Sequence, residues 1–347
     1  TRPGPGSEAP ACTRSARAVF VDSQNRVWSG TQGSGACLYD PATGTWRAFL
    51  AQDPSSATPG PVSVRDFAEA TNGTIWLATS LGLAYLAPGA DQPVAVLHPG
   101  DATGPNRYNP VTLAYAAEQG DAGTLWIAAY GGLLDAFDLR TQQFTHYHGA
   151  TPDAPLLSSA LPVDLTVDRD GQVWVATWDG GLNRFDPQTQ ALTVYRADPG
   201  DPAALSSDQV MKVIQDSAGR MWVATYGGGI NLLDPQTGHS THYRSSAVDP
   251  RSLSQDNVVA LYADRNGLLW VGTEGGGANV LNLFPQPFRQ VRRNPEDPNQ
   301  IGPGLVTAIL EDKSGGGEPG DGGPGRLWVG TSSGGLARVE RNGTGIQ

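Results

Sequence analysis

The sequence is poor in charged residues, and this scarcity excludes two classes of partner. Charged residues are 16% of the 347 residues, and 34 acidic against 23 basic side chains leave a net charge of −11. Nucleic-acid binding depends on Lys and Arg that neutralise phosphates, yet the only lysines here are Lys212 and Lys313. The same acidic balance disfavours docking on an anionic membrane surface. We therefore expect neither a nucleic-acid partner nor a membrane contact through this segment.

Long apolar runs and a leader segment are also missing. No run approaches 18 apolar residues, so the sequence contains no candidate membrane helix. The first residue is Thr1 rather than Met, and no signal peptide is visible. We expect a mature form or a piece of a longer protein.

Cysteine is scarce, with only Cys12 and Cys37, and neither lies in a CxxC motif. In an oxidising compartment the two could form a disulfide, which would add about 3 kcal/mol to stability. The alternative is two unrelated thiols, and the sequence leaves both open.

The sequence does contain a repeat of about 48 residues, centred on tryptophan. The repeat tryptophans are Trp28, Trp76, Trp126, Trp174, Trp222, Trp270 and Trp328, at intervals of 48, 50, 48, 48, 48 and 58 residues. The longer last interval comes from a Gly- and Pro-rich insertion within 314–325. Each copy has four short runs rich in Val, Ile, Thr and aromatic residues, separated by turn residues, and none has a helical period. Four antiparallel strands repeated seven times predict an all-β, seven-bladed β-propeller.

The repeat also predicts how the blades pack and where the propeller ends. The tryptophan lies on the second strand, and the residue two positions later is always Gly or Ala, so we expect a neighbouring blade to press against the sheet there. We assign 1–14 to an N-terminal extension, 15–340 to the propeller and 341–347 to a tail. Since little sequence follows the third strand of the last repeat, we expect that blade to be incomplete and the tail to continue into further domains.

Two motifs of the repeat carry a family resemblance. The first is DRNGLLWVGTEGGG at 264–277, and the second is the linker DPRSLSQDNV at 249–258, which returns as DPAALSSDQV at 201–210. These segments resemble the two-component regulator propeller repeat over about 15–340, most closely over 160–280. The resemblance departs in the first three repeats, where the Gly-rich turn or the Leu-Ser linker is altered.

The resemblance implies a function as well as a fold. It implies a periplasmic ligand-sensing domain that precedes a membrane helix and a cytoplasmic output, commonly a histidine kinase or a diguanylate cyclase. It also implies a receptor that associates as a dimer. Because none of the output machinery lies in this chain, we expect the chain itself to be no enzyme. Since a propeller supports many functions, the functional step is an analogy.

A ligand site is expected at one rim of the propeller. The residue that opens the turn after each second strand forms a ring of Gln32, Ser80, Tyr130, Trp178, Tyr226, Glu274 and Ser332. Three consecutive repeats place Tyr130, Trp178 and Tyr226 at this point, and aromatic faces next to acidic acceptors suit a sugar. The nine residues predicted to bind an oligosaccharide or other small ligand are Gln32, Tyr130, Trp178, Asp179, Asp208, Gln209, Tyr226, Asn257 and Glu274. The alternative is that the aromatic residues only pack on neighbouring turns.

Catalytic and metal sites are not expected, and neither is a cofactor. The Asp-x-x-Gly turns are interpreted as Asx turns, since the segment from Asp168 to Gly171 lacks the distal Glu of a calcium loop. The five histidines are His98, His146, His148, His239 and His242, and none lies on an inner strand or in a rim turn. This weakens a similarity to streptogramin lyase, a propeller enzyme that uses a rim histidine near a metal. A protein-binding scaffold is the other alternative, because propeller rims commonly hold peptides.

Overall fold

The structure is a computed structural model, and it describes residues 16–50, 62–96, 110–117, 123–151, 154–249 and 251–283, together with strands between 306 and 346. The chain divides into two compact units, Thr1–Phe284 and Pro285–Gln347. The predicted extension 1–14, His98, the insertion 314–325 and Ser332 lie outside the described residues.

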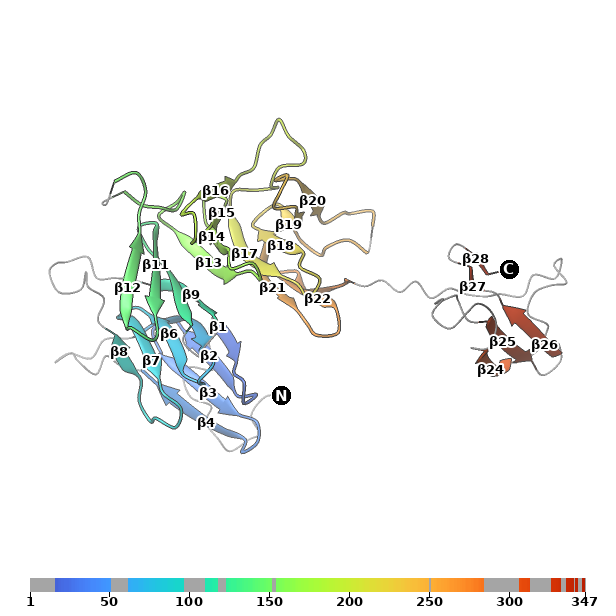
Figure 1. Ribbon diagram of the computed structural model, residues 1–347, viewed down its shortest axis with the longest axis horizontal. Helices are drawn as coiled ribbons and strands as arrows, with labels where there is room; N and C mark the ends of the chain where they lie inside the picture. The colour runs from blue at the N-terminus through green and yellow to red at the C-terminus, as the bar shows by residue number, and fades with distance from the viewer. Residues whose placement is uncertain are drawn as a thin grey trace. The chain divides into compact units, whose positions relative to one another are not determined.

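The first unit consists of six antiparallel sheets in chain order, coloured from blue to orange in Figure 1. Blade 1 contains β1 (Ala16–Val21), β2 (Val27–Thr31), β3 (Ala36–Asp40) and β4 (Thr45–Phe49). Blade 2 contains β5 (Val64–Glu69), β6 (Ile75–Thr79), β7 (Gly82–Leu86) and β8 (Val94–Val96). Blade 3 contains β9 (Pro110–Ala116), β10 (Thr124–Ala129), β11 (Leu133–Asp138) and β12 (Gln143–Tyr147). Blade 4 contains β13 (Pro162–Val167), β14 (Val173–Thr177), β15 (Leu182–Phe185) and β16 (Leu192–Tyr195). Blade 5 contains β17 (Val210–Gln215), β18 (Met221–Thr225), β19 (Gly229–Leu233) and β20 (Ser240–Tyr243). Blade 6 has three strands, β21 (Val258–Ala263), β22 (Leu268–Thr273) and β23 (Gly277–Asn282).

The first strand of each blade is the inner one. Contacts run from β1 to β5, to β9, to β13, to β17 and to β21, so each inner strand packs beside the inner strand of the next blade. The remaining strands follow outward in sequence order within each sheet. The fold is therefore an all-β propeller with antiparallel blades, as predicted.

The predicted number of seven blades is wrong, because the structure shows six. The seventh repeat does form the sheet that its sequence predicts, with β24 (Val306–Asp312), β25 (Arg326–Thr331) and β26 (Gly335–Val339), but this sheet belongs to the second unit. It has three strands, and the tail strands β27 (Arg341–Asn342) and β28 (Gly345–Ile346) pair with each other. The repeat pattern specifies how strands pair within one sheet. The number of sheets that pack together as blades depends on contacts between sheets, which the repeat pattern does not specify.

The hydrophobic core lies between blades. Five clusters each combine the tryptophan of one blade with apolar residues from the inner strands of the next, for example Trp174 with Val213 and Val223. The tryptophans of blades 1 to 5 are buried, whereas Trp270 in blade 6, the last of the unit, is 43% exposed. The small residue after the tryptophan follows from this packing, since a Cβ at Gly30 would lie 2.5 Å from the carbonyl oxygen of Val64 in blade 2.

The Asp-x-x-Gly turns are Asx turns, as interpreted from the sequence. In blade 4, Oδ1 of Asp168 accepts the backbone N–H groups of Asp170 and Gln172, at 3.0 and 2.9 Å. Its Oδ2 accepts the indole N–H of Trp174 at 2.7 Å, which ties the turn to the buried ring. The same indole bond recurs in blades 1, 5 and 6. The carboxylate therefore satisfies a donor that would otherwise be buried without an acceptor.

A second repeated network explains the Leu-Ser linker and the Gly-rich turn. In blade 5, Ser206 N–H donates to Oδ1 of Asn231 at 2.9 Å, and Asn231 donates to the Ser206 hydroxyl at 2.8 Å. A Cβ at Gly228 would overlap the Ser206 hydroxyl and lie 2.6 Å from the Thr225 hydroxyl. Blades 4 and 6 repeat the Ser–Asn pair. The middle glycine leaves room for the linker serine, which fixes the linker against its own blade.

Cys37 on β3 is disulfide-bonded. The other cysteine of the sequence is Cys12, which lies outside the described residues. Of the two alternatives that the sequence left open, the structure has the disulfide.

Candidate functional site

The predicted rim is formed by backbone hydrogen bonds between the second-strand turns and the linkers between blades. Trp178 N–H donates to the carbonyl of Leu161 at 3.0 Å, and Tyr226 N–H donates to that of Gln209 at 2.9 Å. The N–H of Glu274 donates to the carbonyl of Asn257 at 2.9 Å. Each turn-opening residue is thus held beside the linker that enters its blade, while its side chain takes no part in these bonds.

Three rim side chains from consecutive blades form one cluster. The rings of Trp178 and Tyr226 lie 5.7 Å apart between centroids, with an angle of 49° between their planes. The Tyr226 hydroxyl donates to Oε2 of Glu274 at 2.6 Å. This hydrogen bond, together with the negative charge of Glu274, raises the pKa of Tyr226. We call Trp178, Tyr226 and Glu274 the rim cluster.

The rim cluster is open to solvent. Trp178 is 37% exposed, although it is a large aromatic residue, and Glu274 is also exposed. The repeat tryptophans of blades 4 and 5, by contrast, are completely or almost completely buried. Trp178 is therefore not part of the hydrophobic core, and part of its ring is exposed to solvent.

Tyr130 belongs to a different contact. The guanidinium of Arg65, in the inner strand of blade 2, lies 5.3 Å from the centroid of the Tyr130 ring, which is a cation–π arrangement. Arg65 also donates to the carbonyl of Pro110 at 3.0 Å. Tyr130 is 38% exposed, and its ring contacts Arg65, whereas Trp178 and Tyr226 contact each other.

The other predicted residues divide into exposed and engaged groups. Asp179 is exposed beside Trp178 and accepts a short hydrogen bond from the Ser159 hydroxyl. Asp208 is engaged elsewhere, because it accepts the N–H of Ala197 at 2.8 Å and pairs with Arg196 at 3.3 Å. The backbone carbonyls of Gln209 and Asn257 accept the rim hydrogen bonds described above. Gln32 is an exposed residue that follows the second strand of blade 1.

Sequence reasoning missed a charged group on the inner strands. Lys212 of β17 pairs with Asp164 of β13 at 2.6 Å, and Asp164 also accepts the N–H of Val213 at 3.0 Å. The negative charges of Asp164 and, less strongly, Asp66 raise the pKa of Lys212 against the opposing effect of burial. The signal in the sequence was a charged residue within an apolar inner strand, at the same register in several repeats.

Asp66 on β5 forms an equivalent bridge between blades 2 and 3. Its Oδ2 accepts the hydroxyl of Thr112 at 2.7 Å and the N–H of Leu113 at 2.9 Å. Burial raises the pKa of Asp66, and the nearby Lys212 opposes that rise. These inner-strand charges hold successive blades together.

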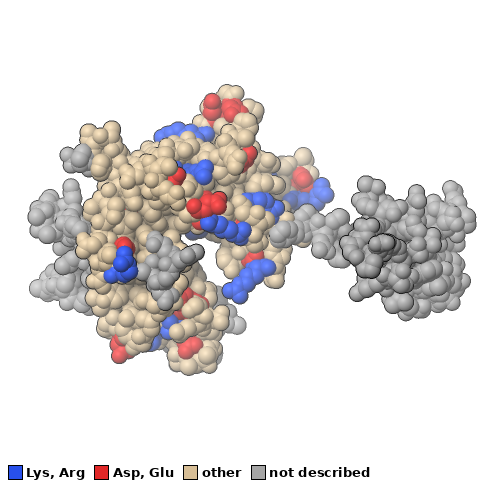
Figure 2. Space-filling view, viewed as in Figure 1, with Lys and Arg blue, Asp and Glu red and all other residues tan. Residues whose placement is uncertain are grey.

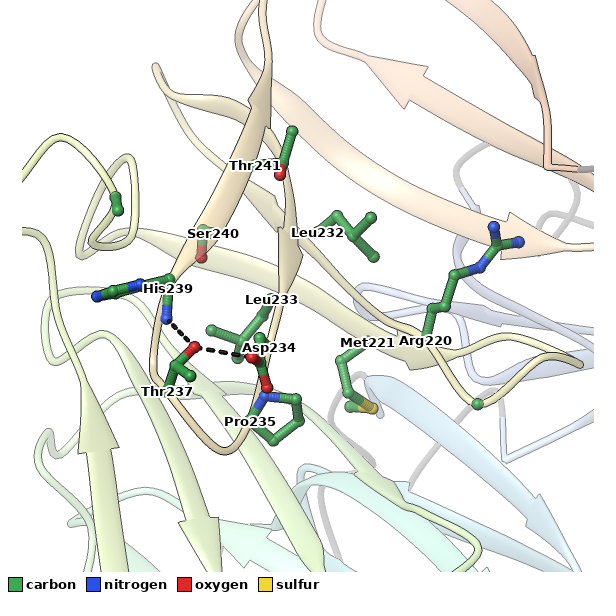
Figure 3. A pocket seen from close by; sticks show the side chains of 12 residues that line it. Arg220, Met221, Leu232, Leu233, Asp234, Pro235, Thr237, His239, Ser240 and Thr241 are labelled. Atoms are coloured by element: carbon green, nitrogen blue, oxygen red, sulfur yellow. Dashed lines mark hydrogen bonds between the residues drawn. The ribbon is translucent and has the colours of Figure 1, made fainter.

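An open hollow of about 700 Å³ lies on blade 5, beside turns at the end of its strands opposite the rim (Figure 3). Its polar groups partly bond to one another, since the Thr237 hydroxyl donates to Asp234 at 2.8 Å and the His239 N–H donates to Thr237 at 3.3 Å. None of the predicted rim residues lines this hollow.

The face drawn in Figure 2 has no large patch of one charge, and the described residues form no metal site. Acidic and basic side chains are interspersed over the face drawn in Figure 2. Within the described ranges, no group of three His, Cys, Asp or Glu side chains is arranged to hold a metal ion. His146 pairs with Asp135 at 2.8 Å on the outer half of blade 3, and His242 bonds to the carbonyl of Ala204 beside blade 5.

The repeats match a known family. Residues 204–227 and 252–275 match the family model described as the two component regulator propeller. These segments include the start of the Gly-rich turns of blades 5 and 6, up to Gly227 and Gly275, so the resemblance seen in the sequence is confirmed. A search of curated proteins finds no match.

Solved structures support the fold at low sequence identity. The extracellular domain of a protein described as a hybrid two component system from B. thetaiotaomicron has a TM-score of 0.63 at 21% identity, over 98% of this chain and 41% of its own. PorZ, a surface component of the type-IX secretion system of Porphyromonas gingivalis, has a TM-score of 0.56 at 17% identity, over 92% of this chain and 50% of its own. A catalytically inactive virginiamycin B lyase from Staphylococcus aureus, with quinupristin, has a TM-score of 0.53 at 11% identity, over 96% of this chain and 97% of its own.

Two further observations concern the length of the chain and its helices. It spans less than half the length of the hybrid two component system domain that it matches. In the described part of the chain, no helix has the length and apolar character needed to cross a bilayer.

Proposed function

We propose that this propeller is the periplasmic ligand-sensing part of a bacterial signal-transduction protein, and that it binds a carbohydrate at the rim. The output module would be a histidine kinase or a diguanylate cyclase outside this chain, in a receptor that associates as a dimer. The family match and the similarity to an extracellular domain of a hybrid two component system support the signalling role. The disulfide at Cys37 supports an oxidising compartment, where such bonds persist.

The observation that carries the binding proposal is the open rim cluster. Sugars present C–H faces that stack on aromatic rings, and their hydroxyls donate to carboxylates. Trp178 and Tyr226 supply two rings at 5.7 Å, and Glu274 and Asp179 supply acceptors beside them. Aromatic contact area would dominate the affinity, and the polar groups would set the orientation of the sugar.

Binding is favoured over catalysis for this chain by the positions of the described histidines. His146 lies on β12, His148 directly follows that strand, His242 lies on β20, and His239 precedes it. These are outer strands, and none of the four histidines lies in a turn that follows a second strand. A mechanism of the lyase type, which needs a rim histidine, has no support among these residues.

The test is a substitution that removes the open ring without touching the core. Trp178→Ala should weaken binding of an oligosaccharide selected on a glycan array by about tenfold or more, because a stacked ring contributes on the order of 1–2 kcal/mol. The melting temperature should stay nearly unchanged, since Trp178 is partly exposed. Trp46→Ala is the matched control, because Trp46 packs on Tyr39 in the outer half of blade 1, on β3 and β4.

Isothermal titration calorimetry and thermal unfolding would measure the two effects separately. The proposal fails if Trp178→Ala binds like the wild type, or if its affinity falls only in proportion to a loss of folded protein. It also fails if no glycan on the array binds the wild-type protein.

A further inference from the structure

We infer that the rim selects a ligand with an ammonium group, and that a glucosamine oligosaccharide is the carbohydrate class that fits it. This inference rests on the proposed function of the same rim. It follows from the charges around the rim cluster and from the geometry of its two rings.

The first observation is an uncompensated negative charge. Among the described residues, neither Asp179 nor Glu274 has a Lys, Arg or His within ion-pair distance. Asp208, in the neighbouring linker, differs because Arg196 pairs with it. Two unpaired carboxylates therefore flank the aromatic pair, while the nearby third carboxylate is already neutralised.

The second observation is the state of the Glu274 carboxylate. One oxygen accepts the Tyr226 hydroxyl at 2.6 Å, which orients the carboxylate beside the ring. No described group donates to the other oxygen, and the same is true of Oδ2 of Asp179, whose Oδ1 accepts from Ser159. Both residues thus present an acceptor to the solvent at the rim.

The third observation is the angle between the rings. The rings of Trp178 and Tyr226 pack obliquely on each other, tilted by 49° with centroids 5.7 Å apart, and each ring keeps part of its surface open to solvent. The face of an aromatic ring carries partial negative charge and attracts a cation. A hydrogen bond from the tyrosine hydroxyl to a carboxylate increases the electron density of that ring. The open part of this aromatic pair, with Glu274 bonded to Tyr226 and Asp179 next to Trp178 in the chain, suits an ammonium group, which has three donors and a positive charge.

The same charges disfavour the other common classes of sugar. A uronic acid or a sulfated sugar would bring a negative charge towards Asp179 and Glu274. A neutral or N-acetylated sugar would stack on Trp178 but leave both carboxylates without a cationic partner. An amino sugar combines the C–H faces needed for stacking with the ammonium group that the carboxylates lack.

The experiment compares two probes with the same backbone, a glucosamine hexasaccharide and its fully N-acetylated form. Titration calorimetry at about pH 5.5 keeps the amines protonated and most of the carboxylates ionised. We expect the wild-type protein to bind the amine form about tenfold more tightly, from cation–π and surface ion-pair contributions. This preference should shrink when the salt is raised from about 0.05 M to about 0.5 M, because exposed charges are screened.

Two variants, each of which removes one negative charge, test whether Glu274 is responsible for the preference. Glu274→Gln keeps an acceptor for Tyr226 but removes the charge, so it should lose most of the preference for the amine form. Asp170→Asn is the matched control, because Asp170 is exposed in the turn before β14, whereas Trp178 follows that strand. It should keep the wild-type preference.

The outcomes separate this inference from the proposed function. Equal binding of both hexasaccharides, with loss of both in Trp178→Ala, overturns the ammonium selectivity and leaves the carbohydrate site standing. A tighter binding of the acetylated form also overturns the selectivity. A preference that Glu274→Gln and Asp170→Asn reduce equally would reveal a general charge effect and overturn the assignment to the rim. Absence of binding by either hexasaccharide, while another glycan binds through Trp178, overturns only the selectivity.

Discussion

Blade 2 lacks an acceptor that four other blades possess, and supplying it should stabilise the protein. The position that holds Asp22, Asp168, Asp216 and Asp264 in the other blades is Ala70 in blade 2. The indole nitrogen of Trp76 is accordingly buried without a hydrogen-bond partner. We predict that Ala70→Asp raises the stability of the first unit.

Blade 4 provides the template for the size of this effect. The turn backbone is the same in both blades, since Ala70 N–H donates to the carbonyl of Thr74 at 2.9 Å and Asp168 N–H to that of Gln172 at 3.0 Å. The introduced carboxylate should therefore reach the indole of Trp76 as Asp168 reaches Trp174 at 2.7 Å. A hydrogen bond to a charged acceptor contributes about 1.5–3 kcal/mol. Burying the new carboxylate costs part of this, so we expect a net gain of about 1–2 kcal/mol and a rise in melting temperature of about 2–5 °C.

The gain should depend on pH in a defined direction. The backbone N–H of Leu268 and the indole of Trp270 lower the pKa of Asp264. In Asp216, burial alone would raise the pKa, but hydrogen bonds from Trp222 and Arg220 together lower it. If the introduced carboxylate behaves in the same way, the unfolded state binds its proton more tightly than the folded state does. The gain is then fully present above the unfolded pKa, about 3.9, and is lost as the pH falls through the lower folded value.

Thermal and urea unfolding, followed by circular dichroism at about pH 7 and about pH 3, would measure the effect. Ala70→Asn is the matched control, because its single oxygen cannot accept from both the turn and the indole, and it should gain less than about 0.5 kcal/mol. The reasoning is refuted if Ala70→Asp is destabilising at pH 7, or if the Asn and Asp variants give the same gain.

Two further substitutions test contacts that hold the blades. Gly228→Ala should cost about 1–3 kcal/mol in the free energy of unfolding, because the new methyl group would displace Ser206, whereas Gly200→Ala, with only Asp198 nearby at 3.3 Å, should be nearly neutral in the same urea titration. Lys212→Met should lower the free energy of unfolding by about 1–3 kcal/mol, because it leaves Asp164 buried without its cation. This range is reduced for solvent screening, since the Lys212 side chain is 37% exposed. Adding Asp164→Asn should recover part of that loss, and a double-mutant cycle that finds no coupling between these two residues would contradict the role assigned to the pair.

The sequence was informative about features that repeat within one blade. The position of Trp174 on a second strand, the Asx turn at Asp168 and the rim turn at Trp178 were all predicted, because each depends on residues close in sequence. Periodicity also made the propeller fold predictable, since only a repeated sheet explains tryptophans at a nearly constant interval.

Features that depend on the contact between blades were not predictable. The pair of Lys212 with Asp164 joins residues 48 positions apart, and nothing in either strand indicates which neighbour the charge will meet. Tyr130 was grouped with Trp178 by position, yet its cation–π contact is with Arg65 of the preceding blade. The sheet that carries Trp328 forms as predicted, but its sequence does not indicate whether it packs as a seventh blade against the other six.

The backbone bonds that hold the rim leave its chemistry open to change. Trp178, Tyr226 and Glu274 are anchored through their N–H groups to the carbonyls of Leu161, Gln209 and Asn257, and any residue except proline can make such a bond. Their side chains can therefore be replaced one blade at a time at little cost to folding. The side chains contact one another, but the backbone frame does not depend on them, so a new specificity can arise, or be engineered, by exchanging these residues while the scaffold stays intact.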